Sequence, residues 1–420
     1  MGTKNRLPGS FAVVITSYNY RRYVIDAIES VRSQTRAPRQ VIVVDDGSTD
    51  GSAELLQARY ADNPRVTLLC GPNTGQLGAF ARGVAHADAD ILAFLDADDR
   101  WSDDYLAQIG ALYDGRPDVD FVFTNINLFG DEHGVHGYAD RPIDLGQTAL
   151  ATWMTGWWYG EATSALSMRR PWAVRSLDLP STFQQAWRLS GDNALVFGSS
   201  ILGARKFFLP TASVQYRVHG ANGWWHSRER EQLFENRFRA RSLINHYARE
   251  MAMDGRTMEL VKQEFLSKPD PSRDEAIRYA LMALRSGVWL PQRLWRAASI
   301  MRRAGPTERR AEDAGSPGRA GVQAPAGVKA AWRPRHTPPH LNLPDTRFEA
   351  RHNPLVSLQV MFGGRRRVQG LCNGADIQQE AAVAGLPGIA ACSEPALRPH
   401  PGHRQCQHRR HCRNALLVSR

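Results

Sequence analysis

The stretch that decides the fold runs from residue 91 to residue 99 and reads Ile91-Leu92-Ala93-Phe94-Leu95-Asp96-Ala97-Asp98-Asp99. Five apolar residues in a row suit a strand that is covered on both faces. Three acidic residues follow within four positions, where that strand ends. A plain turn is the alternative interpretation, but packing alone gives no reason for so many acids. The acids therefore indicate a binding site at the end of a buried strand.

Three other apolar runs precede this strand, and three segments with apolar residues at helical spacing alternate with them. The runs cover residues 11–16, 41–44 and 66–69, and the helical segments cover residues 24–31, 55–60 and 77–84. We expect Ser48, Thr49 or Asp50 to cap the second helix, because short polar side chains favour that position. Strands and helices in this rhythm predict an α/β domain with a mainly parallel sheet.

Beyond residue 100 the pattern becomes mixed. We expect a helix, then a strand, then loops over a binding face, then two more strands and a charged helical region. These elements are predicted at residues 105–113, 119–124, 130–160, 165–168, 207–216 and 226–300. Periodicity stops near residue 303, and no internal repeat is present.

The net charge of +11 belongs to the last 120 residues. Residues 301–420 hold 18 Arg, one Lys and eight acids, whereas residues 1–300 carry 34 basic and 34 acidic side chains. Half of the 24 Pro also lie beyond residue 300. This composition predicts a disordered tail. The preference for Arg over Lys is also what GC-rich codons give in any reading frame, so an out-of-frame extension is a second interpretation.

Composition excludes several classes of protein. A hydrophobic content of 42% is too high for a wholly disordered chain. No apolar run approaches the roughly 18–20 residues of a membrane-spanning helix. The apolar run at residues 11–15 is shorter than the roughly 7–15 residues of a secretory signal. Cys70 is the one cysteine among the first 300 residues, which excludes a disulfide framework there and favours a cytoplasmic location.

A second acidic pair, Asp45 and Asp46, follows the apolar run at residues 41–44. In an open parallel sheet ligands bind beyond the carboxyl ends of the strands, so both acidic clusters should converge on one crevice. Carboxylates gathered in this way repel one another unless a cation compensates, and hard oxygen ligands suit Mg²⁺ or Mn²⁺ better than zinc. A divalent ion with open positions can hold a diphosphate. The alternative for residues 46–50 is a turn with a helix cap.

The chain resembles family 2 glycosyltransferases with the GT-A fold. Four segments carry the resemblance over roughly residues 10–225, and their order and spacing make it specific. They are residues 13–19 (VVITSYN), 43–50 (VVDDGSTD), 73–75 (NTG) with Ala81 and Arg82, and 94–99 (FLDADD). A later segment, residues 215–222 (QYRVHGAN), is similar to the closing segment of the family.

The resemblance implies the residues that bind the donor. Thr16 and Tyr18 would line the nucleobase pocket, and Asp46 would accept a hydrogen bond from the ring N–H of the base, which suits a UDP-sugar. Arg82 would lie near the base or the diphosphate. Asp96 would contact the ribose. An ionised carboxylate suits these positions because it accepts several hydrogen bonds.

The resemblance also implies a metal site and a general base. Asp98 would hold Mg²⁺ or Mn²⁺, Asp99 could replace Asp96 or Asp98, and His219 could complete the metal site or touch the diphosphate. Asp192 matches the catalytic base, with a helix N-cap as the alternative role. Gly191 departs from the family, which usually has an acid before the base.

The implied fold is a mixed, mainly parallel GT-A (Rossmann-like) sheet between helices, followed by a helical extension and a tail. The implied parts are a nucleotide-sugar-binding half (1–100), an acceptor-binding half (101–225), the extension (226–302) and the tail (303–420). The implied activity is inverting transfer of a sugar to a saccharide or lipid-linked acceptor, in cell-surface polysaccharide or glycolipid synthesis. The extension would pack on the catalytic domain, lie on the inner face of a membrane or form a subunit contact.

Other interpretations stay open. The chain could be an inactive glycosyltransferase-like binding protein, or could bind polyanions through its Arg-rich tail. Gly71, Gly75 and Gly78 resemble a dinucleotide-binding loop, but they follow the third strand and not the first. The aromatic clusters at residues 157–159 and 224–225 could stack on sugars or belong to the core. His and Cys residues at 403–412 lack the spacing of a recognised zinc site.

Overall fold

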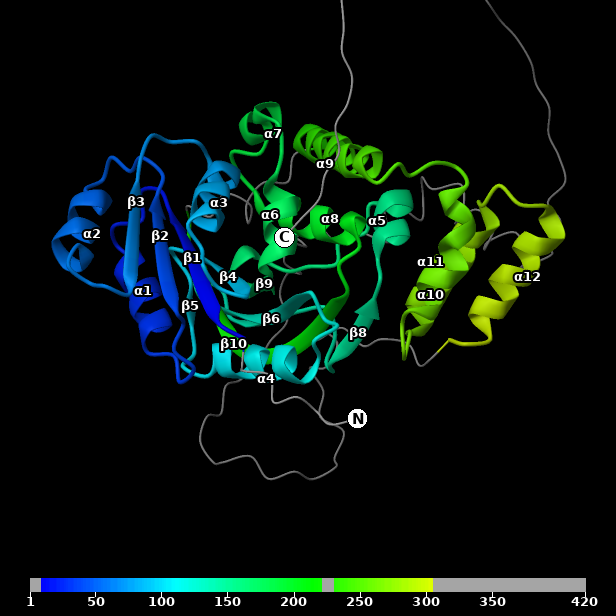
Figure 1. Ribbon diagram of the computed structural model, residues 1–420, viewed down its shortest axis with the longest axis horizontal. Helices are drawn as coiled ribbons and strands as arrows, with labels where there is room; N and C mark the ends of the chain where they lie inside the picture. The colour runs from blue at the N-terminus through cyan, green and yellow to red at the C-terminus, as the bar shows by residue number, and fades with distance from the viewer. Residues whose placement is uncertain (1–8, 221–229, 305–420) are drawn as a thin grey trace, which may run out of the picture. The chain divides into compact units, whose positions relative to one another are not determined.

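The computed structural model describes residues 9–220 and 230–304 (Figure 1). Its strands form one mixed sheet. They are β1 (Phe11–Ser17), β2 (Gln40–Asp45), β3 (Val66–Cys70), β4 (Ile91–Asp96), β5 (Arg100–Trp101), β6 (Phe121–Gly130), β7 (Gly134–His136), β8 (Ile143–Gly146), β9 (Leu166–Arg169) and β10 (Lys206–Val218). The strand order is β3-β2-β1-β4-β9-β6-β10-β5, with β7 beside β6 and β8 beside β10.

The helices are distributed along the whole described chain. They are α1 (Val24–Arg32), α2 (Ser52–Tyr60), α3 (Gln76–Ala85), α4 (Tyr105–Gly115), α5 (Ala149–Thr155), α6 (Arg170–Leu177), α7 (Ser181–Ala186), α8 (Asp192–Leu202), α9 (Arg230–Glu250), α10 (Val261–Leu266), α11 (Arg273–Leu284) and α12 (Leu290–Met301), with the 3₁₀ turns η1 (Thr163–Ala165) and η2 (Thr257–Leu260). Within the described residues, no helix combines the length and the apolar character needed to cross a membrane.

Helices cover both faces of the sheet, as Figure 1 shows. Alternate residues of a strand point to opposite faces. Ala12 and Val14 of β1 accordingly join one core with α3, α6 and α8, whereas Val13 and Ile15 join a second core with α1, α2 and α4. Burial on both faces explains why the strands are continuous apolar runs. The predicted mixed, mainly parallel sheet between helices is confirmed.

The register brings the acidic strand ends together. Strands β1, β2, β3 and β4 are parallel neighbours, and Thr16 pairs with Asp96 while Ser17 pairs with Asp45. The carboxyl ends of β2 and β4 therefore flank the end of β1. This alignment places the two predicted acidic clusters at one edge of the sheet.

Two local predictions were wrong. Helix α2 begins at Ser52 after Gly51, whose φ of 83° suits glycine, so neither Ser48, Thr49 nor Asp50 is the cap residue. The predicted loops at 130–160 contain β7, β8 and α5. In the aromatic cluster at 157–159, Trp158 and Tyr159 are buried in the core, which agrees with the second of the two interpretations left open for it. Residues 224–225 and most of the tail, from residue 305, lie outside the described residues.

Candidate functional site

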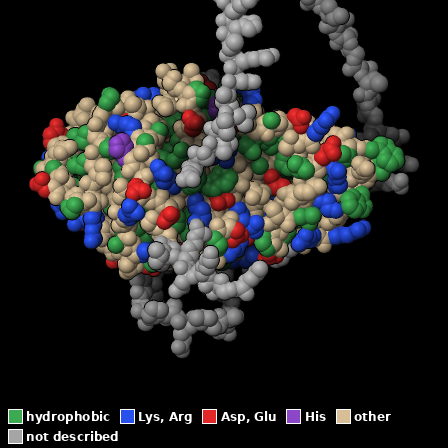
Figure 2. Space-filling view, viewed as in Figure 1, with side chains coloured by type: hydrophobic (Ala, Val, Ile, Leu, Met, Phe, Trp, Pro, Cys, Tyr) green, Lys and Arg blue, Asp and Glu red, His purple; other side chains and the backbone are tan. Residues whose placement is uncertain are grey.

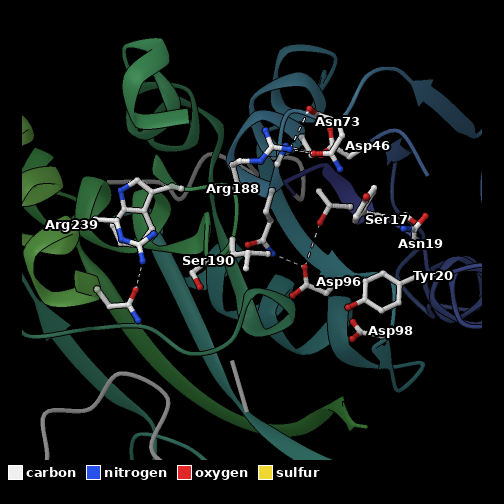
Figure 3. Close-up of a pocket in the computed structure, with 18 of the residues that line it drawn as sticks. Ser17, Asn19, Tyr20, Asp46, Asn73, Asp96, Asp98, Arg188, Ser190 and Arg239 are labelled. Carbon is white, nitrogen blue, oxygen red and sulfur yellow. Dashed lines mark hydrogen bonds between the residues drawn. The ribbon is translucent and has the colours of Figure 1, made fainter. Parts of the chain in front are cut away.

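A cavity of about 1150 Å³ lies over the carboxyl ends of β1, β2 and β4 (Figure 3). Thr16 and Tyr18, at the end of β1, line it together with Asp46, Asp96 and Asp98. The Tyr18 side chain is 47% exposed, so its ring is available to a ligand. The predicted donor-binding residues, with the exception of Arg82, therefore share one cavity wall.

Asp46 is buried and already has four hydrogen-bond donors. Its Oδ1 accepts from the backbone N and Oγ1 of Thr74, both at 2.9 Å, and from Arg82 Nη2 at 2.7 Å. Its Oδ2 accepts from the backbone N of Gly75 at 2.7 Å. A carboxylate oxygen can accept more than one hydrogen bond, so Oδ2 is the atom with capacity for a base N–H.

Arg82 does not line the cavity. It lies on α3 and forms an ion pair with Asp46, in which both partners are largely shielded from solvent. The geometry makes Arg82 a support for the Asp46 carboxylate. The cavity wall contains two other arginines, Arg188 and Arg239, neither of which we expected from the sequence.

Asp96 and Asp98 face the cavity, whereas Asp99 lies beneath it. Asp99 is 1% exposed, and its carboxylate accepts from Ser164 Oγ at 2.6 Å and from the backbone N of Arg217 at 2.7 Å. Burial and the neighbouring charges of Asp98 and Asp96 raise the pKa of Asp99 well above its usual range. The structure thus assigns Asp99 a position behind Asp98, with both oxygens in use.

Asp98 pairs with His219. The His219 Nε2 atom lies 3.0 Å from Asp98 Oδ2, and the Tyr20 hydroxyl also hydrogen-bonds the Asp98 carboxylate. Among residues 9–220 and 230–304, no group of three or more His, Cys, Asp or Glu side chains is arranged to hold a metal. A carboxylate with one further ligand is nevertheless a fitting donor set for Mg²⁺ or Mn²⁺ when substrate phosphates supply the remaining oxygens. Asp98 and His219 fit such an ion.

Asp192 is the first residue of α8, and Gly191 occupies the cap position before it. Burial raises the pKa of Asp192 to about 7, against the opposing effect of backbone N–H groups at the start of the helix. Burial, the charge of Asp98 and then the charge of Asp192 raise the pKa of Asp96 to about 7. A carboxyl that titrates near neutral pH is suited to accept a proton in catalysis.

The structure explains why glycine stands at position 191. A Cβ atom there would lie 2.7 Å from the backbone N of Leu77 and 2.9 Å from its Cα. These are backbone atoms of α3, which cannot rotate away. The Gly191 N–H instead donates to Gln76 Oε1 at 2.8 Å, and Gln76 Nε2 donates to Asp96 Oδ1 at 3.0 Å.

One part of the cavity wall was not predicted. This part comes from the turn before α8 and from α9, a helix that begins more than 130 residues after β4. Figure 3 shows Arg239 on the side of the cavity opposite Asp98 and Tyr20. The unpredicted lining residues in these two elements are Trp187, Arg188, Leu189, Ser190, Glu235, Asn236 and Arg239. Helical periodicity at 226–300 predicted a helix, but no sequence signal showed which element it would cover.

Part of the chain is similar to known proteins. Residues 12–170 match the family model described as Glycosyl transferase family 2. The chain is 32% identical over 217 residues to an uncharacterized glycosyltransferase of Nostoc sp., which covers 50% of this chain and 65% of that protein. It is 29% identical over 168 residues to the amylovoran biosynthesis glycosyltransferase of Erwinia amylovora, which covers 38% of this chain and 56% of that protein.

A third relative matches over a shorter stretch, and a solved structure aligns at low identity. A putative teichuronic acid biosynthesis glycosyltransferase of Bacillus subtilis is 35% identical over 96 residues, 23% of this chain and 38% of that protein. The structure of S. aureus TarS 1-349 in complex with UDP aligns over 70% of both chains at 14% identity, with a TM-score of 0.40. The matches thus span between 38% and 65% of the three curated relatives.

Proposed function

We propose, from the match of residues 12–170 to the family 2 glycosyltransferase model and from the similarity to the Nostoc glycosyltransferase, that the chain is an inverting glycosyltransferase with a UDP-sugar donor and a hydroxyl acceptor. The observation that carries the proposal is the convergence of Asp46, Asp96 and Asp98 from two strand ends on one cavity, with the charge of Asp192 acting on Asp96. The acceptor would be a saccharide or a lipid-linked sugar of cell-surface polysaccharide or glycolipid synthesis.

In the proposed donor site, Tyr18 contacts the base, Oδ2 of Asp46 accepts its ring N–H, and Asp96 contacts the ribose. Asp98 and His219 would hold Mg²⁺ or Mn²⁺. When bound, such an ion supplies positive charge that offsets the diphosphate leaving group.

In the proposed transfer, the Asp192 carboxylate accepts the proton of the acceptor hydroxyl. The hydroxyl oxygen attacks the anomeric carbon from the face opposite the diphosphate and forms the new glycosidic bond. The bond from that carbon to the diphosphate oxygen breaks, and the nucleoside diphosphate leaves with the electron pair. A single displacement of this kind inverts the anomeric configuration.

The test is a screen of nucleotide sugars for transfer and hydrolysis with Mn²⁺, followed by comparison of three variants. We expect Asp98→Asn and Asp192→Asn to abolish transfer, whereas the exposed Asp62→Asn serves as the matched control. Full activity of Asp192→Asn beside inactive Asp98→Asn would remove the base assignment. A product of retained configuration would refute the single displacement, and donor binding without any turnover would favour an inactive binding protein.

We also propose that α12 contacts an anionic membrane surface. Trp289, Leu290, Leu294 and Trp295 are between 55% and 75% exposed, and Figure 2 shows apolar side chains gathered on the side of the molecule where Figure 1 places α12. Spacing along the helix puts Leu290, Leu294 and Met301 on one stripe. A cluster of large apolar side chains exposed to solvent indicates an interaction site.

The charge beside this stripe supports a lipid partner. Residues 285–304 contain five arginines and no acidic residue, namely Arg285, Arg293, Arg296, Arg302 and Arg303. Exposed Leu and Trp side chains together with several arginines on one helix are typical of helices that lie in the headgroup region of anionic bilayers.

Vesicle sedimentation tests the membrane contact. We expect the full chain to bind vesicles containing phosphatidylglycerol, and the variant Leu294→Ser with Trp295→Ser to lose most of that binding at about 0.5 M salt, where electrostatic adsorption is screened. The control variant carries Val135→Ser and Val174→Ser, two other exposed apolar positions. Equal binding by both variants would refute the proposal, and a change of oligomeric state in the first variant would point to a subunit contact.

A further inference from the structure

We propose that Gln76 is a positioning residue that fixes the general base segment relative to the donor-binding carboxylate, a role that rests on the function proposed above. Gln76 is the first residue of α3 and lies in the cavity wall. Its carboxamide connects two elements. Nε2 donates to Asp96 Oδ1 at 3.0 Å, and Oε1 accepts from the backbone N of Gly191 at 2.8 Å.

The backbones on either side of this bridge are in direct contact. The Gln76 backbone N donates to the Arg188 carbonyl at 2.8 Å. A Cβ on Gly75 would lie 2.5 Å from Arg188 Cα, and a Cβ on Gly191 would lie 2.7 Å from Leu77 N. The two segments therefore approach as closely as their backbones allow, and the Gln76 side chain joins them at the cavity.

The turn that Gln76 holds is conformationally costly. Ser190 has a φ of 58°, a left-handed conformation that a residue other than glycine adopts only when its surroundings enforce it. Asn193 Nδ2 donates to the Ser190 carbonyl at 3.0 Å from the following helix. Since Asp192 comes two residues after Ser190, loss of the bond to Gly191 should let the base move away from the acceptor hydroxyl.

A carboxamide is the side chain that can serve both neighbours at once. It donates to a carboxylate with its nitrogen and accepts from an N–H with its oxygen. Glutamate keeps the acceptor for Gly191 but places a second carboxylate against Asp96, which weakens binding of an anionic donor. Methionine keeps the approximate length and removes both hydrogen bonds. Comparison of the two substitutions therefore distinguishes the hydrogen bond to Asp96 from the hydrogen bond to Gly191.

The kinetic test compares Gln76→Met and Gln76→Glu with the exposed Gln292→Met in the full chain. For Gln76→Met we expect kcat for transfer to fall about 10- to 100-fold, the loss expected for a misplacement of about 1 Å, while KM for the donor changes little. For Gln76→Glu we expect a clear rise of KM for the donor. Gln292→Met should leave both constants unchanged. A kcat within twofold of the parent in a folded Gln76→Met variant would overturn the proposal.

Hydrogen exchange at the Gly191 amide tests the bridge without turnover. We expect the Gly191 N–H to exchange at least tenfold faster in Gln76→Met than in the parent chain and in Gln292→Met. Unchanged exchange would overturn the proposal even if activity fell. If the parent chain transferred no sugar, the proposed function would fail, and the exchange measurement would still decide whether Gln76 holds the base segment.

Discussion

Replacement of Gly191 by alanine adds one carbon atom where the backbone of Leu77 already lies. The Gly191 φ of −61° is an ordinary conformation for alanine. Reduced freedom of the unfolded chain would therefore stabilise the variant by about 0.4–1 kcal/mol if the space were open. The space is not open, because the new Cβ would meet Leu77 N at 2.7 Å and Leu77 Cα at 2.9 Å.

The steric cost of the new Cβ should exceed the stabilisation that comes from reduced freedom of the unfolded chain. Overpacking of a well-packed site costs about 1–3 kcal/mol, and a backbone neighbour cannot relieve the contact by changing rotamer. Any outward shift of residue 191 also lengthens its bond to Gln76 Oε1, which is 2.8 Å in the structure. We therefore expect Gly191→Ala to lower the free energy of unfolding by about 1–2 kcal/mol and to reduce sugar transfer.

Denaturant unfolding of the full chain measures this cost. Gly115→Ala is the matched control, because a Cβ at Gly115 would have no atom within 4 Å. The control should be neutral or slightly stabilising. If Gly191→Ala unfolded at the same denaturant concentration as the parent chain and transferred sugar equally fast, the close approach of α3 to this turn would be refuted. Higher activity of Gly191→Glu would show instead that the acid usual in the family is tolerated there.

Three further predictions concern charge. Because burial raises the pKa of Asp192 to about 7 in the free chain, kcat/KM for transfer should fall about tenfold for each pH unit below about 7, where the protonated base cannot accept a proton. A flat profile of kcat/KM from about pH 5.5 to 7 would contradict this. Arg82→Met removes the ion pair of Asp46 and should raise the KM for the donor about tenfold with little change in kcat. If titration calorimetry found the donor affinity unchanged, the assignment of Asp46 as a contact of the base would be contradicted. Glu264→Gln leaves one of two buried N–H groups at the start of α5 without an acceptor. Denaturant unfolding should show a free energy of unfolding that is lower by about 1–3 kcal/mol. The control Glu259→Gln, at an exposed position, should leave the free energy of unfolding unchanged.

The donor side of the site could be predicted because local sequence determines it. Each buried strand ends where its apolar run ends, and the parallel register then brings Asp46 and Asp96 together regardless of the loops between them. The ion pair between Arg82 and Asp46 could not be predicted from local sequence. Both residues were recognised, but only the packing of α3 shows that the guanidinium holds the carboxylate and does not face the ligand.

The opposite wall could not be predicted because tertiary packing determines it. Periodicity indicates that a helix has an apolar face but not which surface that face will cover. Gly191 illustrates the same limit. The sequence showed it only as a departure from the family pattern, whereas in the structure it is the residue that the close approach of α3 requires. Gln76 carried no signal at all, since one glutamine at the start of a helix is unremarkable.

Helix α9 makes the cavity depend on the helices after residue 230. Arg239 lines the cavity and donates to the Ala186 carbonyl at 3.2 Å, just before the turn that leads to Asp192. Farther along, Glu264 accepts from the N–H groups of Leu150 and Ala151 at 2.7 and 3.0 Å. These two contacts join the helices to the sheet domain, and one of them lies in the wall of the cavity. Substitutions in α9 should therefore change acceptor use, whereas substitutions on the exposed face of α12 should not.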